Sequence, residues 1–274
     1  MMYNSFEEDM KRVLITGSAG GMGRAVALTL AKNGYYVYSC DIKTNPTEHE
    51  NIKQIVMDVT KTESIENAFR IVSKETEQLD GILNFAGIIM MDSLVEISEE
   101  EYLKIFDVNV FGAFRVNKRF FPLIQKNKGK IIITTSELAP NKILPFNAIY
   151  SISKKSLDAY AEGLRMELGL LDIPVITLRP GAVQTDLIGH SNNSLEKLEA
   201  KTEIYKGITT KFKHIVDSEQ GTAIPAEKIG QLVLKILNKK KPKYVYTKNA
   251  SVKLKLLSIV PAKLQMKILK MILK

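Results

Sequence analysis

The sequence predicts an α/β fold, in which one domain is built on a doubly wound parallel sheet of about seven strands with helices on both faces. Two observations lead to this prediction. Short apolar, β-branched runs alternate with segments of helical periodicity, and glycine or polar residues follow the apolar runs. The 274 residues are 45% hydrophobic, which is enough for one sizeable core. We expect this domain to span 1–248 and a basic amphipathic extension to span 249–274.

A glycine-rich turn follows the first predicted strand. The run R-V-L-I-T at 12–16 reads as a buried strand, and A-V-A-L-T-L-A-K-N at 25–33 reads as a helix closed by Gly34. The turn G-S-A-G-G-M-G at 17–23 would place a helix N-terminus against a pyrophosphate, and its glycines allow close backbone approach. This unit predicts a Rossmann-type dinucleotide site. Its assigned residues are Gly17, Ser18, Gly21, Met22 and Gly23.

The second predicted strand, at 35–40, ends in Asp41. A carboxylate at this place can accept hydrogen bonds from a ribose diol and would repel a 2′-phosphate. Asp41 therefore predicts NAD rather than NADP as the cofactor, although Lys43 lies close enough to soften the repulsion. The alternative is that Asp41 only caps the following turn.

The same alternation continues through the rest of the chain. Thr62 is the expected N-cap of a helix with Ile65, Phe69 and Val72 on one face. Ligands bind at the carboxyl ends of the strands in such sheets. The residues Gly17, Asp41, Asn84, Ser136 and Pro180 fall at these ends. The further expected strands are 52–57, 81–87 running into a glycine turn, 130–135, 174–178 and 244–247, and the further helices are 62–76, 99–125, 148–170 and 226–238.

Tyr150 and Lys154 lie four residues apart in Y-S-I-S-K, so a helix would project them from one face. The ordinary pKa of tyrosine is about 10, and a nearby ammonium would favour the phenolate. Ser136, or its neighbour Thr135, could bond the same substrate oxygen from the preceding strand end. The trio fits proton transfer at a carbonyl or alcohol. The spacing alone is weak evidence, because it is common on solvated helix faces.

Taken together, these elements resemble the classical short-chain dehydrogenase/reductase family. The resemblance implies hydride transfer between nicotinamide C4 and a substrate carbon, with Tyr150 as acid/base and Ser136 orienting the substrate oxygen. It implies that Lys154 binds the nicotinamide ribose and lowers the tyrosine pKa, and that Asn109 holds a water in a proton relay. The matching segments are T-G-S-A-G-G-M-G at 16–23, N-F-A-G at 84–87, Asn109, Ser136, Y-S-I-S-K at 150–154 and P-G-A-V-Q-T at 180–185.

The resemblance also implies a set of cofactor contacts. Besides the glycine turn and Asp41, these residues are Asp58 and Val59 at the adenine, Asn84, Ala86 and Gly87 at the centre, and Tyr150, Lys154, Pro180, Gly181, Val183 and Thr185 towards the nicotinamide. Two positions depart from the family pattern. Phe85 replaces the usual second asparagine, and Glu137 follows Ser136 where a small or apolar residue is usual. A carboxylate at 137 would select a polar substrate group or point to solvent.

The composition argues against disulfide-bonded, metal-binding, secreted and membrane-spanning proteins. The single cysteine, Cys40, excludes an intramolecular disulfide, suggests a reducing compartment and is expected to be buried in its strand. His49, His190 and His214 are isolated, so no metal site is expected. The start M-M-Y-N-S-F-E-E-D lacks the features of a secretion signal, and no apolar run reaches 18 residues. We therefore expect a cytoplasmic protein.

The positive charge is concentrated at the end of the chain. Residues 235–274 contain twelve lysines and no arginine or acid, so the remainder of a chain with net charge +9 sums to −3. No aromatic interleaving supports nucleic-acid binding. Residues 261–274 predict a helix beginning at Pro261, with lysines along one stripe and apolar residues over much of the remainder. It would lie on an anionic membrane surface, or pack over the substrate pocket or a subunit of a homodimer or homotetramer.

Fewer features of the sequence bear on the substrate. The segment 186–222 is polar and is expected to form an irregular, mobile lid. Leu187, Ile188, Leu195 and Leu198 would line a hydrophobic pocket together with 142–149. The C-terminus is similar to that of hydroxysteroid and retinol dehydrogenases. We therefore expect a lipophilic secondary alcohol or ketone. The alternatives are a 3-oxoacyl ketoreductase and a protein that senses NAD without turnover.

Overall fold

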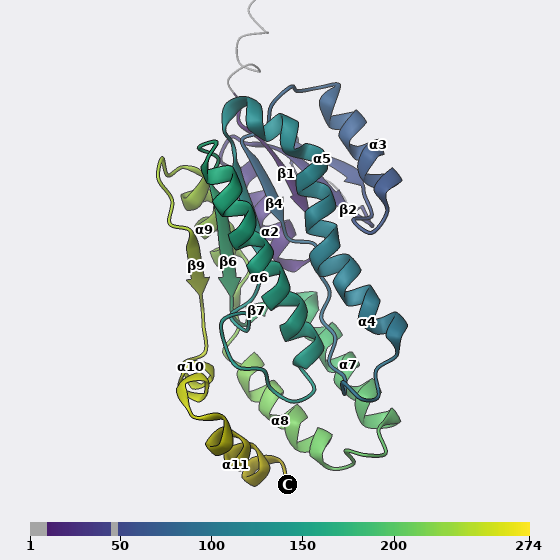
Figure 1. Cartoon of the computed structure of the whole chain (residues 1–274). Helices are drawn as coiled ribbons and strands as arrows, with labels where there is room; N and C mark the ends of the chain where they lie inside the picture. The colour runs from purple at the N-terminus through teal and green to yellow at the C-terminus, as the bar shows by residue number, and fades with distance from the viewer. Residues whose placement is uncertain (1–9, 45–48) are drawn as a thin grey trace, which may run out of the picture.

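The computed structural model describes residues 10–44 and 49–274, and a seven-stranded parallel sheet forms its centre (Figure 1). The strand order is β3-β2-β1-β4-β5-β6-β9, so strands after β3 are added on the other side of β1, as in doubly wound folds. The expectation about a secretion signal concerns residues 1–9, which lie outside the described part. The strands are β1 (Arg12–Thr16), β2 (Tyr36–Asp41), β3 (Ile52–Val56), β4 (Gly81–Asn84), β5 (Lys130–Thr134), β6 (Val175–Pro180) and β9 (Val245–Lys248).

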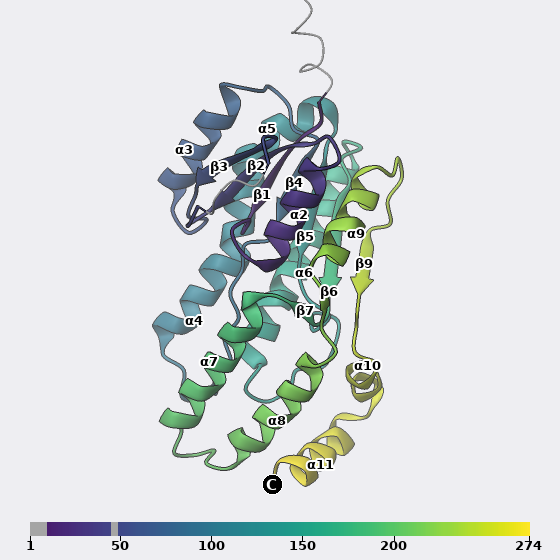
Figure 2. The ribbon, with the colours of Figure 1, turned by 180° about the vertical axis from the view of Figure 1, so that it is seen from behind.

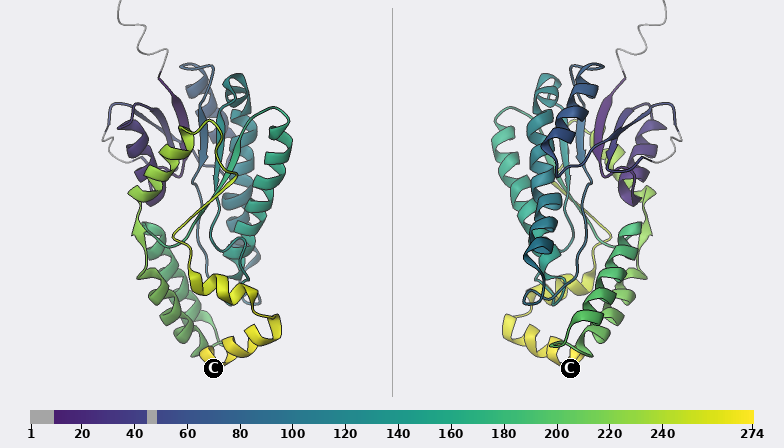
Figure 3. Two further views of the ribbon diagram at one scale, coloured as in Figure 1. Left: turned by 90° about the vertical axis from the view of Figure 1, so that its left-hand side faces the viewer. Right: turned by 90° about the vertical axis from the view of Figure 1, so that its right-hand side faces the viewer.

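Helices cover both faces of this sheet, as the side views of Figure 3 show. One face carries α3 (Thr62–Ser73), α5 (Gly112–Asn127) and α6 (Ala148–Gly169). The opposite face carries α2 (Gly21–Ala31) and α9 (Glu227–Leu237), which lie side by side in Figure 2. The helix α4 (Glu99–Phe106) continues through a π-helical turn, η1 (Asp107–Phe111), into α5.

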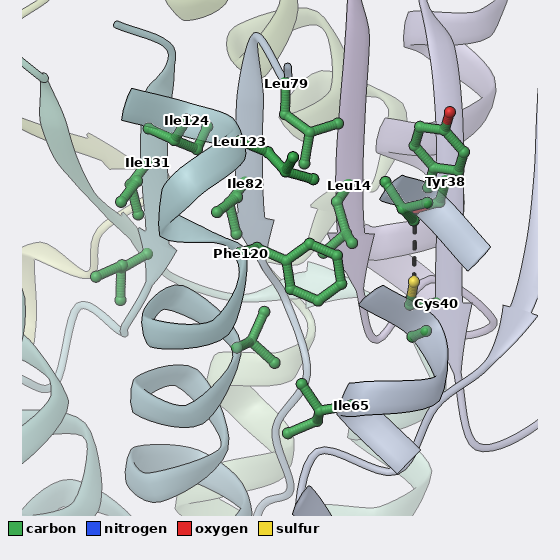
Figure 4. Packing of buried hydrophobic residues seen from close by; sticks show 14 of the residues in the cluster. Leu14, Tyr38, Cys40, Ile65, Leu79, Ile82, Phe120, Leu123, Ile124 and Ile131 are labelled. Carbon is green, nitrogen blue, oxygen red and sulfur yellow. Dashed lines mark hydrogen bonds between the residues drawn. The ribbon is translucent and has the colours of Figure 1, made fainter. Parts of the chain in front are cut away.

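Each face of the sheet has its own apolar core. In Figure 4, aliphatic side chains of neighbouring strands meet Phe120, Leu123 and Ile124 of α5, and Cys40 lies buried beside them. The expectation that Cys40 is buried is confirmed, and burial raises the pKa of its thiol. On the other face, Val26 and Leu30 of α2 pack with Ile229 of α9 against β1 and β6. These two cores hold the strand ends in fixed positions.

The fold predicted from the sequence is confirmed, with small differences at element ends. Helix α2 begins at Gly21 rather than at residue 25, because the turn glycines already adopt helical geometry. Thr62 is the first residue of α3, and Lys61 occupies the N-cap position without a side-chain cap. The expected N-cap role of Thr62 was therefore wrong, whereas Ile65 and Val72 are buried as predicted.

The segment 186–222 is not irregular. It forms α7 (Asp186–Lys201) and α8 (Ile208–Gln220), and the short strands β7 (Val183–Gln184) and β8 (Ile224–Pro225) pair at its base. Both helices have an apolar stripe, and Leu195 and Leu198 pack against Phe212. This stripe is hard to recognise in the sequence, because most residues of 186–222 are polar. The side chains of Leu187, Ile188 and His190 lie outside the described part.

The chain ends in two helices, α10 (Val252–Ile259) and α11 (Ala262–Leu273), and Pro261 is the N-cap of α11. They lie beside α8 at one end of the molecule (Figure 2). Leu273 is buried against Phe212 in the cluster that also contains Leu195. One side of the C-terminal extension therefore packs on the segment 186–222. None of the described helices combines the length and apolarity needed to cross a bilayer.

Candidate active site

A cavity of about 1960 Å³ opens at the carboxyl ends of β1, β2, β4 and β5. Its volume exceeds that of an ordinary small-molecule pocket, roughly 300–1,000 Å³, so it has room for a dinucleotide together with a second ligand. The residues of the predicted site that line it are Gly17, Gly21, Met22, Gly23, Asp41, Asp58, Val59, Ala86, Gly87, Ser136, Tyr150, Lys154, Pro180 and Thr185. The fold therefore brings together in space most of the residues selected from the sequence.

The glycine turn is built for close backbone contact. Gly17 has φ of 67°, and a Cβ there would lie 2.6 Å from the Ala86 nitrogen. A Cβ at Gly23 would lie 2.1 Å from the Gly17 carbonyl oxygen, and one at Gly21 would lie 2.3 Å from Thr185. No side chain caps α2, so its first-turn N–H groups have neither an intrahelical acceptor nor a side-chain cap. This arrangement suits a pyrophosphate at the helix N-terminus.

Asp41 ends β2 at the rim of the cavity. Its carboxylate accepts hydrogen bonds from the Ala19 N–H at 2.9 Å and from the Lys43 N–H at 3.3 Å, so it braces the glycine turn. An ionised carboxylate has about four acceptor positions, so two remain for hydroxyl donors. The bracing role and a ribose contact are therefore compatible.

Asp58 and Val59 lie next to this rim, where β3 ends. Asp58 accepts hydrogen bonds from the N–H and hydroxyl of Thr60 at 2.8 and 2.7 Å, which fixes the turn into α3. Val59 is 7% exposed and packs closely on Gly112, where an added Cβ would lie 2.7 Å from the Val59 side chain. Both residues face the cavity.

The predicted trio of Ser136, Tyr150 and Lys154 converges in the cavity. Ser136 follows β5, and Tyr150 and Lys154 lie on α6 with exposures of 7% and 5%. The Lys154 Nζ donates to the Thr134 carbonyl at 3.1 Å and lies 5.8 Å from the centroid of the Tyr150 ring. The Ser136 hydroxyl accepts from the Leu138 N–H at 3.2 Å and lies close enough to the phenol to lower the pKa of Tyr150. The Thr135 hydroxyl instead donates to Asp158 at 3.0 Å, which leaves Ser136 as the serine or threonine hydroxyl at the phenol.

The two ionisable groups of the trio are strongly desolvated. Burial raises the pKa of Tyr150 to about 12, the hydrogen bond with Ser136 lowers it, and the Glu137 charge raises it. Burial alone lowers the pKa of Lys154 to about 8. Desolvation is the largest influence on the phenol, and the lowering of its pKa by Lys154 stays a prediction.

Asn109 lies in the π-helical turn and is fully buried. Its Oδ1 accepts from the Ile88 N–H at 2.8 Å, and its Nδ2 donates to the Ile88 carbonyl and the Ser153 hydroxyl, both at 3.0 Å. An added Cβ at Gly87 would lie 3.2 Å from Asn109 Oδ1 and 3.3 Å from Lys154 Nζ. Asn109 and Lys154 therefore both lie next to Gly87. π-helical turns of this kind often mark functional sites.

The match to known proteins decides the family. Residues 11–196 match the family model of short chain dehydrogenases. The chain belongs to the short-chain dehydrogenase/reductase family.

Individual relatives agree with this assignment. The chain is 28% identical over 233 residues to a 3-ketodihydrosphingosine reductase of Bacteroides thetaiotaomicron, with 85% of each chain covered. It is 32% identical over 206 residues to estradiol 17-beta-dehydrogenase 2 of Rattus norvegicus, covering 70% of this chain and 52% of the other. An alcohol dehydrogenase from Thermococcus sibiricus complexed with 5-hydroxy-NADP shares the fold, with a TM-score of 0.68 and 23% identity over 88% of this chain and 97% of that one.

Some predicted residues of this short-chain dehydrogenase do not face the cavity. Asn84 is buried beneath it, where its Nδ2 donates to Asn117 Oδ1 at 2.9 Å and to the Ile132 carbonyl at 3.3 Å. Its side chain therefore joins β4 to α5 and β5. The Ser18 hydroxyl accepts a hydrogen bond from Ser39 at 2.8 Å. The predicted residues outside the lining are Ser18, Asn84, Asn109, Gly181 and Val183.

Sequence reasoning missed the apolar wall of the cavity. Ile88, Ile89 and Met90 follow the glycine turn of β4 and line the space beside Tyr150. The run I-I-M-M at 88–91, which follows N-F-A-G, could have indicated this wall. The expected lining by Leu195 and Leu198 is wrong, because both are 1% exposed in a closed cluster with Phe146. Polar residues of α7, such as Asn193 and Lys197, line the cavity instead.

The segment 186–222 covers the cavity from the side of α7. The Ser194 hydroxyl accepts from the Met91 N–H at 2.8 Å and donates to the Met91 carbonyl at 3.0 Å. Lys201 pairs with Asp92, and the Thr202 hydroxyl donates to Glu96. These contacts hold α7 on the loop that follows the apolar wall.

Proposed function

We propose that this short-chain dehydrogenase is an NAD-dependent oxidoreductase of lipophilic secondary alcohols and their ketones. The observation that carries the proposal is the buried Ser136–Tyr150 pair in a large cavity beside an apolar wall. A bound nicotinamide would supply or accept the hydride. Tyr150 would donate a proton to the substrate oxygen during reduction and accept one during oxidation, and Ser136 would hydrogen-bond the same oxygen. Lys154 and the glycine turn would hold the cofactor.

The apolar wall supports a lipophilic substrate. Ile88, Ile89 and Met90 lie beside the phenol, where they would contact carbon rather than oxygen atoms of a substrate. The names of two relatives point the same way, because they specify a ketone of dihydrosphingosine and estradiol. The first of these relatives is a ketoreductase, so reduction of a 3-oxoacyl ketone is the second candidate function. An NAD sensor without turnover is disfavoured, because the catalytic trio is complete.

This function is tested by incubating the protein with NAD and a panel of sterols, bile acids, retinol and simple secondary alcohols while following NADH absorbance. The reverse assay uses NADH with the matching ketones and a 3-oxoacyl thioester. Turnover of one lipophilic pair with little activity on the thioester supports the proposal. Preferential turnover of the thioester would move the assignment to the ketoreductase.

Cofactor preference gives a second prediction. Asp41→Ser should lower kcat/KM for NAD and raise it for NADP, so that their ratio changes by roughly one hundredfold, because a hydroxyl neither accepts the two ribose hydrogen bonds nor repels a phosphate. The measurement is kcat/KM with each cofactor for wild type and variant. Glu75→Ser is the control, because Glu75 pairs with Lys53 outside the cavity lining. Equal use of both cofactors by the wild type would contradict the NAD assignment, and the solved relative with 5-hydroxy-NADP makes this a real test.

We also propose that the protein is cytoplasmic and contacts a membrane surface through α10 and α11. Val252, Ile259 and Met271 are 68%, 80% and 78% exposed, although they belong to packed helices. Exposed lysines accompany them, and α10 and α11 contain no acid. Apolar side chains mixed with lysines suit the boundary of an anionic bilayer. A lipophilic substrate could then enter the cavity from the lipid.

The membrane proposal predicts that Ile259→Ser with Met271→Ser weakens binding to vesicles of phosphatidylcholine and phosphatidylserine by about tenfold or more, because burial of two large apolar side chains is lost. Co-sedimentation with vesicles measures the effect. Leu170→Ser is the control, because Leu170 is 87% exposed but follows α6. If the double variant instead lowers the oligomeric state and leaves vesicle binding unchanged, these helices contact a subunit and not a membrane.

We propose that the protein forms a homodimer or homotetramer. Phe111, Phe114 and Met166 are 51%, 42% and 71% exposed around α5 and α6, which gives these helices an apolar surface suited to a second copy of the chain.

A further inference from the structure

Glu137 follows the catalytic serine directly, but its carboxylate is committed elsewhere. The Glu137 N–H donates to the Pro180 carbonyl at 2.9 Å, which fixes the residue at the end of β6. Its Oε2 accepts from the Ser251 N–H at 2.6 Å, and Ser251 is the N-cap of α10. The carboxylate therefore does not simply point to solvent, which was one of the two alternatives predicted from the sequence. It joins the loop after β5 to the start of the C-terminal helices.

The same loop holds the far end of α10. The Ser258 hydroxyl donates to Asn141 Oδ1 at 3.1 Å, and it accepts from the Lys142 N–H at 3.0 Å. The Lys142 ammonium also bonds the Val260 carbonyl just after α10. Asn141 is itself fixed, because its Nδ2 donates to the Glu137 carbonyl at 2.8 Å. Both ends of α10 are thus bonded to the segment 137–142.

The next helix continues this connection to the cover of the cavity. Leu273 of α11 is 5% exposed in the cluster with Phe212 of α8 and Leu195 of α7. The Lys211 ammonium of α8 donates to the Lys274 carbonyl at 2.7 Å. Residues 249–274 therefore run from the loop after β5 to α8, which packs on α7, the helix that lines the cavity (Figure 2).

We propose that Glu137 is a positioning residue that anchors the C-terminal helices to the loop after β5, so that α8 and, through it, α7 are held in place beside the substrate. This inference rests on the proposed function, since it concerns the substrate end of the same cavity. A carboxylate suits the position, because it lies at the N-terminus of α10, where the helix dipole favours a negative charge. The hydrogen bond it accepts is charge-assisted and shorter than a neutral one.

The test compares two ways of breaking one hydrogen bond. Glu137→Ala removes the acceptor, and Ser251→Pro removes the donor at a residue whose φ of −66° already suits proline. Ser251→Ala is the control, because it removes the side-chain cap but keeps the N–H. Glu137→Gln keeps an acceptor oxygen and should restore most of the activity.

We expect Glu137→Ala and Ser251→Pro each to raise KM for a lipophilic substrate by roughly tenfold with a smaller change in kcat, because the cover of the cavity loosens while Tyr150 stays in place. Combining them should add little, because both remove the same bond. Fully additive effects, or a wild-type KM in Glu137→Ala, would overturn the inference.

A second readout does not depend on turnover. Trypsin cleavage at the exposed Lys253 and Lys255 of α10 should accelerate several-fold in Glu137→Ala and Ser251→Pro, because cleavage requires local opening of the helix. NADH affinity should stay unchanged in both. Faster cleavage in an enzyme without detectable substrate would support the anchor while the proposed function fails. Unchanged cleavage would reject the anchor whatever the substrate is.

Discussion

Tyr150→Phe should lower kcat by roughly a thousandfold in both directions and leave NADH affinity within about twofold, because the variant loses only the group that transfers the proton. Kinetic assays with the substrate identified from the panel measure kcat, and NADH fluorescence measures binding with little protein background, since the chain contains no tryptophan.

Tyr160→Phe is the matched control for this variant. Tyr160 lies on the same helix, and its hydroxyl accepts a hydrogen bond from Asn117 at 3.3 Å, away from the cavity lining. It should retain nearly full activity. Substantial turnover in Tyr150→Phe would remove the phenol from the mechanism, and loss of NADH binding would show that the change damaged the site.

The same phenol should give the two directions different pH profiles. Burial raises the pKa of Tyr150 to about 12, so the phenol is protonated at neutral pH and ready to donate to a carbonyl oxygen. Oxidation needs the phenolate, whose fraction increases with pH. The ratio of oxidative to reductive kcat/KM should therefore rise with pH across the neutral and alkaline range.

Lys154→Met should lower kcat/KM by roughly a hundredfold or more and yet stabilise the protein without cofactor. The lysine is 5% exposed, and burial lowers its pKa from 10.5 to about 8, which corresponds to a free-energy penalty of roughly 3 kcal/mol for keeping it charged. Methionine has a similar length and carries no charge. The variant should lose the interaction with the cofactor ribose and have a higher Tm.

The pH dependence separates this charge effect from better packing. The folded-state pKa of Lys154 lies below its unfolded value, so the penalty is complete below about pH 8 and disappears as pH rises towards 10.5. The Tm advantage of Lys154→Met should therefore be greatest at neutral pH and shrink above pH 8. Lys235→Met, at an exposed position of α9, should show no such trend. A Tm gain that is constant with pH would show that the buried charge has no role.

Most of the fold follows from local patterns. Buried parallel strands need continuous apolar runs, and the sequence has them at β1, β4 and β5, so their limits could be predicted within three residues. The polar residues at strand ends, including Asp41 and Ser136, could be placed at one edge of the sheet for the same reason. The prediction of an irregular segment at 186–222 was wrong, because its helices bury only a narrow apolar stripe against each other and against α11.

Some site residues could also be predicted from local sequence, and others could not. Gly17 and Gly23 could be predicted, because a tight turn and close approach require glycine whatever surrounds them. The role of Asn84 could not, because its position in the strand does not say whether its side chain faces the cavity or Asn117 beneath it. The pKa of Tyr150 also depends on burial, which raises it and which the local sequence does not show.

The sequence by itself determined the strand and helix order and the glycine turn after β1, because each depends on residue types at short spacing. It also pointed to Ser136, Tyr150 and Lys154, which the fold brings together in one cavity. Only the tertiary structure decided where the Glu137 carboxylate is bonded and what the last helices cover. These contacts join residues more than one hundred positions apart, and no local pattern records which distant backbone group a side chain will meet.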